Sequence, residues 1–158
     1  MITDKEIKIS FKEYGKLDEM EILDRELALE AINAMKGSYS PYSHFHVGAA
    51  VRLSDGTIVR GANQENAAFP SGTYAERSTM FAAGAQYPDK DMVSIAVAGG
   101  LDGVLSDHPA TPCGACRQVM AQYQTKAGKP MSVIMVGKDK IWKFSRVDDI
   151  LPLIFDQI

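Results

Sequence analysis

Residues 112–117 read Pro-Cys-Gly-Ala-Cys-Arg and contain the only two cysteines of the 158-residue chain, Cys113 and Cys116. A Cys-x-x-Cys pair that opens a helix places two sulfurs about one turn apart, where both can bind one zinc ion. The same spacing also suits a disulfide or a redox pair. A reducing compartment disfavours a structural disulfide, and a redox pair usually lies near the start of a βαβ unit. This pair comes late in the chain, so we favour a metal site.

A second segment, Ala75-Glu76-Arg77, precedes the cysteines at the predicted start of another helix. A glutamate in this position usually does no more than interact favourably with the helix dipole. Zinc deaminases, however, combine a His- or Cys-x-Glu segment with a later Pro-Cys-x-x-Cys segment, and their glutamate moves protons without binding the metal. The order of the two segments here therefore points to deaminase chemistry, although Tyr74 occupies the position of the first ligand.

The hydrophobic periodicity around these segments predicts alternating helices and strands. Helices are expected over residues 18–35, 74–86 (capped by Ser71 or Thr73), 113–126 and 148–155. Strands are expected over 45–53, 57–62, 92–98, 131–137 and 140–144, with Asp55-Gly56 as a hairpin turn. This order predicts a single α/β domain over 1–158, a layered sandwich in which helices cover a mixed sheet of about five strands. Residues 1–17 show no clear period and are expected to form an N-terminal arm.

Bulk composition excludes several classes of partner. Apolar residues make up 46% of the chain, charged residues 23%, and the net charge is −3, whereas a nucleic-acid-binding surface needs a basic face. No apolar run approaches the roughly 18 residues of a membrane span, and the charged N-terminus lacks a signal-peptide core. We therefore expect a cytoplasmic protein that binds neither nucleic acid nor membrane.

Taken together, the motifs resemble those of the homotetrameric cytidine deaminase family. The similarity begins near residue 25 and is carried by residues 42–50, 63–70, 75–77, 112–118 and 151–155. It implies the cytidine deaminase-like fold, a homotetramer, a Zn²⁺ cofactor and a free pyrimidine nucleoside as substrate. The implied reaction is hydrolytic deamination of cytidine or deoxycytidine to uridine or deoxyuridine and ammonia, in pyrimidine salvage. A catalytically impaired nucleoside-binding homologue, or a deaminase of another cytosine-containing nucleoside, is the alternative.

The resemblance also implies which residues bind the substrate. Phe45 would pack against the pyrimidine ring, although a phenylalanine in a strand can equally be a core residue. Asn63 and Glu65 would hydrogen-bond the ribose hydroxyls, although polar residues are expected in such a loop. The backbone of Ala75 would contact the carbonyl of the base.

The remaining implied roles concern the chemistry. Glu76 would be the catalytic proton shuttle, and Cys113 and Cys116 would bind zinc. Arg77 would hydrogen-bond the thiolates and temper their charge, a role that supports the metal from outside its ligand shell; otherwise it is a solvated helix residue. His44, His46 and His108 are expected to be surface or loop residues.

Tyr74 is the one departure from the family pattern, because the family has a cysteine there and related deaminases have histidine. A catalytic zinc needs three protein ligands and an open position for water. A tyrosine oxygen lies about 6.5 Å from its Cα, against roughly 2.8 Å for a cysteine sulfur, so Tyr74 cannot replace a thiolate without moving the metal or the helix. Three interpretations stay open: a weak zinc site, an empty site that still binds nucleosides, or an introduced change in an ordinary enzyme.

Overall fold

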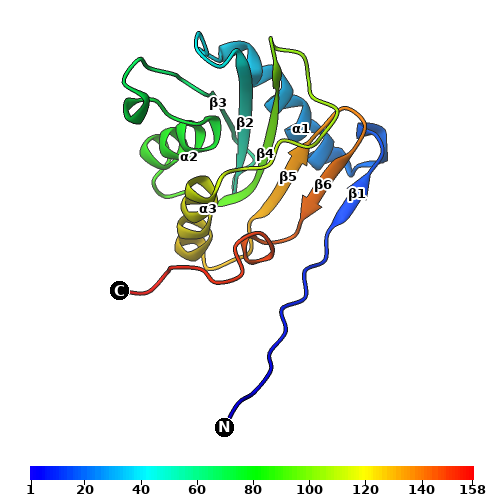
Figure 1. Ribbon diagram of the computed structural model, residues 1–158, viewed down its shortest axis with the longest axis vertical. Coiled ribbons are helices and arrows are strands. Elements are labelled where there is room, and N and C mark those ends of the chain that lie inside the picture. The colour runs from blue at the N-terminus through cyan, green and yellow to red at the C-terminus, as the bar shows by residue number, and fades with distance from the viewer.

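The computed structural model describes residues 1–158 and contains a six-stranded mixed sheet with helices on both faces (Figure 1). In chain order the elements are β1 (Lys12–Tyr14), α1 (Ile22–Ala34), β2 (Phe45–Leu53), β3 (Ile58–Ala62), α2 (Ala75–Gln86), β4 (Met92–Leu101), α3 (Gly114–Ala127), β5 (Ser132–Val136) and β6 (Ile141–Phe144). Single 3-10 turns occur at Leu17–Glu19, Met35–Gly37, Phe69–Ser71 and Val147–Asp149. The predicted α/β sandwich is confirmed.

The strands are ordered β1-β6-β5-β4-β2-β3 across the sheet. Only β4 and β5 pair in parallel, and α3 is the crossover that connects them; every other neighbouring pair is antiparallel. A parallel pair needs such a crossover because its second strand must start again from the same end of the sheet. This connection brings the start of α3 beside α2, on one face of the sheet (Figure 1).

The two faces of the sheet bury separate hydrophobic clusters. One joins side chains of α2 and α3 to β2, β4 and β5, and the other joins those of α1 to the opposite face. Helix and sheet approach each other unusually closely at two glycines. A Cβ added to Gly48 would lie 2.2 Å from the carbonyl oxygen of Ala31 in α1, and one added to Gly61 would lie 2.4 Å from Oγ1 of Thr79 in α2. The strands β2 and β3 therefore fix the positions of both helices.

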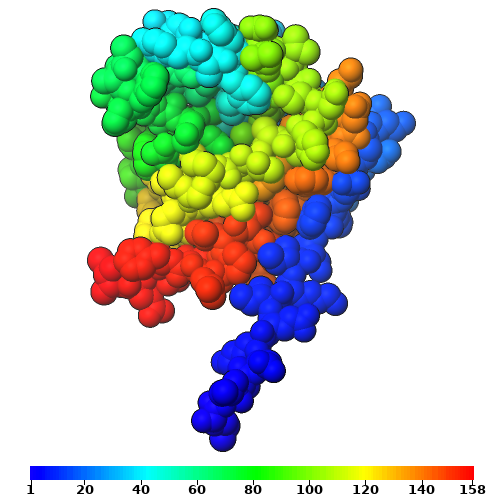
Figure 2. Space-filling view, in the orientation of Figure 1, coloured from blue at the N-terminus to red at the C-terminus, as the bar shows by residue number.

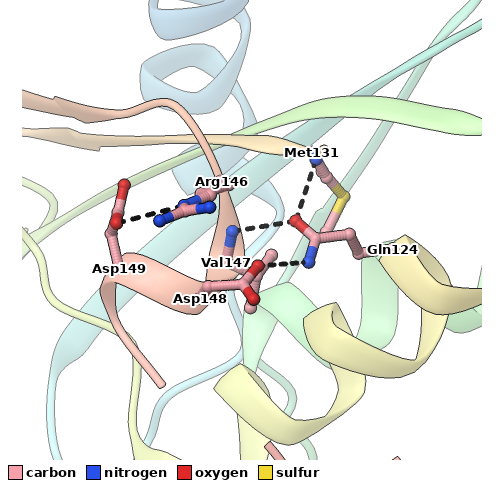
Figure 3. A network of polar contacts seen from close by, with 6 residues as sticks. All are labelled: Gln124, Met131, Arg146, Val147, Asp148 and Asp149. Carbon is pink, nitrogen blue, oxygen red and sulfur yellow. Dashed lines mark hydrogen bonds and ion pairs between the residues drawn. The ribbon is translucent and has the colours of Figure 1, made fainter. Parts of the chain in front are cut away.

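The side chain of Gln124 connects the C-terminal end of α3 to two neighbouring segments by hydrogen bonds (Figure 3). Its Oε1 accepts hydrogen bonds from the backbone N–H groups of Met131, at 3.0 Å, and Val147, at 2.9 Å, and its Nε2 donates to Oδ1 of Asp148 at 2.8 Å. Both backbone donors belong to fully buried residues, where an unsatisfied N–H group is costly. The side-chain amide of Gln124 thus joins α3 by hydrogen bonds to the start of β5 and to the turn that follows β6.

Three sequence predictions need correction. The helix expected over 148–155 is absent and only the turn Val147–Asp149 forms, because Pro152 offers no N–H and its ring clashes with a helical backbone. The sheet has a sixth strand, since β1 lies within the expected arm and pairs with β6. Neither Ser71 nor Thr73 caps α2; the N-cap is Tyr74, and its side chain makes no capping hydrogen bond.

The first eleven residues extend from the body of the molecule (Figures 1 and 2). All of them are exposed, and the last, Phe11, stacks on Phe144 with 4.7 Å between ring centroids and meets Trp142 edge-to-face at 5.6 Å. These aromatic contacts anchor the arm where β1 begins. None of the helices combines the length and apolarity that crossing a bilayer requires.

Candidate functional site

The site lies where the first turns of α2 and α3 meet. Tyr74 is the N-cap residue of α2 and Cys113 that of α3, and both have extended backbone conformations with no side-chain cap. Because the first N–H groups of a helix have no partners within the helix, both helix ends present free donors and positive dipole ends toward this region. Glu76 and Cys116 follow in these first turns and point inward, since both are buried.

Glu76 is a buried acid, with only 5% of its surface exposed. Burial raises the pKa of its carboxyl above the ordinary value of 4.5, opposed by a backbone hydrogen bond, the Cys116 thiol and the positive charge of Arg77. A raised pKa brings a carboxyl closer to neutrality, where it both accepts and donates protons efficiently. Glu76 therefore has the environment of a general acid–base residue.

The two cysteines differ sharply in exposure. Both are free thiols; Cys113 is exposed, whereas Cys116 is completely buried. Burial, followed by the nearby negative charges of Glu76 and Cys113, raises the pKa of Cys116 to about 12, while Arg77 lowers it. The Nε atom of Arg77 is buried and has no hydrogen-bond partner. Deprotonation of Cys116 would place a negative charge near the Arg77 guanidinium, which is the group that lowers the pKa of this thiol.

Zinc fits these residues only in part. Two sulfurs and the unpartnered Arg77 donor are what a thiolate-bound metal requires, but no group of three His, Cys, Asp or Glu side chains could hold a metal ion. Tyr74 does not fill the gap: it is 52% exposed, and its ring lies over the Arg77 guanidinium at 5.0 Å. The donor set is one protein ligand short of a catalytic zinc site.

The histidines do not supply the missing ligand. His108 is exposed, and its ring packs edge-on against Trp142 in β6, with 6.0 Å between centroids. His44 is also exposed and adopts a left-handed backbone conformation, with φ of 57°, just before β2. His46 lies in β2 and is partly exposed.

Asn63 and Glu65 are already engaged in hydrogen bonds. Asn63 is 6% exposed; its Oδ1 accepts from Ser38 Oγ and the Val47 N–H, and its Nδ2 donates to the Phe45 carbonyl. One Oε atom of Glu65 accepts from two consecutive backbone N–H groups, and hydrogen bonding from Ser43 is the main cause that lowers the pKa of this carboxyl. One amide hydrogen of Asn63 and one carboxylate oxygen of Glu65 remain for a ligand.

Beside these residues lies an open cavity of about 700 Å³. Its lining includes Asn63, Glu65, Tyr74 and Arg77 among the predicted site residues. It also includes Tyr42 and Phe69, which meet edge-to-face at 5.8 Å. Sequence reasoning assigns these two aromatic residues no role, although both lie in the segments that carry the family resemblance.

Phe45, Ala75, Glu76 and the two cysteines do not line this cavity. Phe45 is the first residue of β2 and is 40% exposed, so it is not part of the core. Ala75 is the first residue of α2 and is fully buried. Asn63, Glu65, Tyr74 and Arg77 therefore line the open cavity, whereas Glu76 and Cys116 form a buried acid–thiol cluster. Cys113 and Phe45 are exposed and belong to neither group.

A glutamate that precedes a Pro-Cys-x-x-Cys segment is the signature of zinc deaminases. The fold places these two segments, which contain Glu76 and Cys116, at the N-termini of α2 and α3. Residues 22–129 match the family model described as the cytidine and deoxycytidylate deaminase zinc-binding region. The chain belongs to this family, as the resemblance predicted.

Individual relatives agree with this assignment. The chain is 46% identical to the cytidine deaminase of Halalkalibacterium halodurans over 101 residues, 63% of this chain and 72% of the relative. It is 34% identical to a probable cytidine deaminase of Dictyostelium discoideum over 80% of each chain. The solved cytidine deaminase of Burkholderia pseudomallei superposes with a TM-score of 0.69 at 36% identity, covering 82% of this chain and 97% of that one.

Proposed function

We propose that the chain is a hydrolase that deaminates cytidine or deoxycytidine to uridine or deoxyuridine and ammonia. The observation that carries the proposal is Glu76, a buried carboxyl close to the thiol of Cys116, whose pKa is raised by burial. The relative that is 46% identical to this chain is named a cytidine deaminase, and the one that is 34% identical is named a probable cytidine deaminase. An acid–base residue is what deamination needs, because the leaving amine must gain a proton.

Glu76 would perform the proton transfers. It would take a proton from the attacking water and deliver it to N3 of the cytosine, and would then take the second proton of that water from the hydroxyl at C4 and deliver it to the amine that leaves. Cys113 and Cys116 would hold zinc, which when bound supplies a Lewis acid that makes water nucleophilic near neutral pH. Arg77 would donate its free Nε–H to a thiolate and stabilise the deprotonated sulfur.

The substrate would be held by the neighbouring residues. The free amide hydrogen of Asn63 and the free carboxylate oxygen of Glu65 would bind ribose hydroxyls. The exposed ring of Phe45 would pack against the pyrimidine, and the backbone of Ala75, in the first turn of α2, would contact the carbonyl of the base. A cavity of about 700 Å³ is in the range of small-molecule sites.

The setting proposed for this activity is pyrimidine salvage in the cytoplasm, with a free nucleoside as the substrate. We propose that the working assembly is a homotetramer. Large apolar side chains at Phe81, Leu101 and Phe155 are exposed in the single chain and would be covered by neighbouring subunits, with the region of Phe155 as a candidate contributor to a neighbour's site. Sedimentation of a stable 17.2 kDa monomer would contradict the tetramer.

A second candidate function is nucleoside binding with impaired catalysis. It is favoured by Tyr74, whose ring covers Arg77 where the family has a ligand, and by the lack of a three-ligand group. A deaminase of another cytosine-containing nucleoside is a closer variant of the main proposal, and only comparison of substrates separates the two.

One experiment distinguishes these functions: zinc per chain measured by mass spectrometry, together with cytidine turnover followed by ultraviolet absorbance. Turnover in the parent that disappears in Glu76→Gln supports the deaminase. Nucleoside binding by calorimetry without turnover, in a correctly folded parent loaded with zinc, supports the binding homologue. No binding and no turnover with any cytosine nucleoside would overturn both.

A further inference from the structure

We propose that Cys113 and Cys116 also form a reversible redox site, in which Cys113 attacks a small-molecule disulfide and the pair ends as an intramolecular disulfide. The inference goes beyond deamination, because it concerns covalent chemistry at the sulfurs and needs no nucleoside. It rests on the positions and exposure of the two cysteines and on the incomplete set of metal ligands around them.

The pair has an attacking sulfur and a protected sulfur. Cys113 is exposed and stands at the N-cap of α3, so a reagent can reach it from solvent. Cys116 is fully buried and follows Cys113 by three residues in the first turn of the same helix, so the two sulfurs lie about one turn apart. An exposed first cysteine at a helix N-terminus, followed by a second after two intervening residues, is the arrangement of Cys-x-x-Cys redox motifs. Only Cys113 can therefore meet a bulky disulfide.

The missing ligand leaves the sulfurs open to this reaction. In a site with three protein ligands, zinc would hold both thiolates and block their oxidation. Here no group of three His, Cys, Asp or Glu side chains could hold a metal ion, and the ring of Tyr74 lies over Arg77. Metal and disulfide compete for the same two sulfurs, and the loss of one ligand shifts this competition toward the disulfide.

The reaction balances as two thiol–disulfide exchanges. The Cys113 thiolate attacks one sulfur of the small disulfide RSSR, breaks its S–S bond and releases RS⁻, which takes up the proton that Cys113 had lost. The Cys116 sulfur then attacks the Cys113 sulfur of the mixed disulfide, and the second RS⁻ leaves and takes up the Cys116 proton. The protein pair loses two electrons and RSSR gains them, so two thiols and RSSR become one protein disulfide and two RSH.

Oxidised glutathione tests the proposal on the full-length, reduced, zinc-free chain. Intact mass and thiol titration should show that both thiols are lost together, with a mass lower by two hydrogens and no accumulated mixed disulfide. Cys116→Ser should stop at a mixed disulfide on Cys113. Cys113→Ser should react at least about tenfold more slowly, because its remaining thiol is buried.

Urea provides the control for folding, since in denaturant the two single variants should react at similar rates. Reduced glutathione should return the oxidised chain to two thiols. The proposal is overturned if the folded chain keeps both thiols, if it stops at a mixed disulfide, or if folded Cys113→Ser reacts as fast as Cys116→Ser. Mass and thiol number do not depend on turnover, so the result stands whether or not the chain deaminates cytidine.

Discussion

Replacing Tyr74 by cysteine should turn a partial zinc site into a complete one. The substitution removes the ring that lies 5.0 Å from the Arg77 guanidinium, a cation–π contact worth about 0.5–1 kcal/mol at an exposed site. Without zinc, the variant should therefore be less stable than the parent by about that amount. With zinc, the order should reverse, because a third thiolate completes the three-ligand set of a catalytic site.

The stability difference between Tyr74→Cys and the parent in the presence of zinc follows from their relative affinities for the metal. Residues that merely support a metal ligand change affinity by about 10–100-fold, so a direct ligand should contribute at least about 100-fold. At free zinc about 100 times the Kd of the variant, binding stabilises the variant by about 2.7 kcal/mol, and the parent by no more than about 0.4 kcal/mol. After subtraction of the lost contact with Arg77, Tyr74→Cys should exceed the parent by about 1.5 kcal/mol.

Urea unfolding followed by circular dichroism measures the difference in free energy of unfolding between Tyr74→Cys and the parent. This difference should be negative without zinc and positive with zinc. Tyr74→Ser is the matched control, because it also removes the ring but adds no thiolate, and it should lose stability in both conditions. At the same free zinc concentration, cytidine turnover should be higher in Tyr74→Cys than in the parent or in Tyr74→Ser. The gain in zinc affinity should be larger at pH 8 than at pH 6, because thiols must lose protons to bind the metal. A parent that already binds one zinc per chain as tightly as the variant would refute the idea that Tyr74 leaves the site one ligand short.

Three further substitutions, one of them with a matched control variant, test the acid–thiol cluster and the scaffold. Glu76→Gln should lower turnover by at least about 10²–10⁴-fold. Burial raises the folded-state pKa of the Glu76 carboxyl above 4.5, so ionisation of Glu76 increasingly destabilises the folded parent as the pH rises above 4.5. Glu76→Gln cannot ionise, and its melting temperature should therefore exceed that of the zinc-free parent by more at pH 7 than at pH 4. Gln124→Ala leaves two buried N–H groups without an acceptor and should cost about 2–4 kcal/mol in urea unfolding, whereas Gln118→Ala loses one exposed hydrogen bond and should cost under about 1 kcal/mol. Gly48→Ala places a Cβ 2.2 Å from a helix carbonyl and should lower the urea midpoint by an amount equivalent to about 1–3 kcal/mol.

Most helices and strands could be predicted because the hydrophobic periodicity and turn residues of each segment agree with its place in the folded structure. The strand expected over 45–53 has those bounds in the structure, since its apolar residues and the Asp55-Gly56 turn specify both strand and hairpin. The strand β1 escapes prediction because three residues carry no readable alternation, and its existence depends on a partner about 130 positions away. The false helix over 148–155 comes from giving its apolar residues more weight than Pro152.

The candidate site could be predicted as a set of residues but not as a geometry. Motif order leads to Glu76 and the cysteines, yet no sequence pattern states that Cys116 is buried while Cys113 is exposed. The contact of Tyr74 with Arg77 likewise depends on a side-chain orientation that only the folded helix defines. The internal hydrogen bonds of Asn63 show the same limit, because they join it to residues far away in the chain.

The pairing of β1 with β6 joins the first strand of the chain to the last. Until β6 has left the ribosome, β1 has no neighbour, and until β5 has left it, β4 lacks its parallel partner. Contacts between such distant segments form slowly, because a long loop must close before any of them can stabilise the fold. During synthesis Glu76 and Cys116 therefore lie on helices without a finished sheet beneath them. A nascent chain from which Cys116 has emerged and β5 has not should present both thiols to solvent, and the contrast between an accessible and a protected cysteine arises only when the sheet forms.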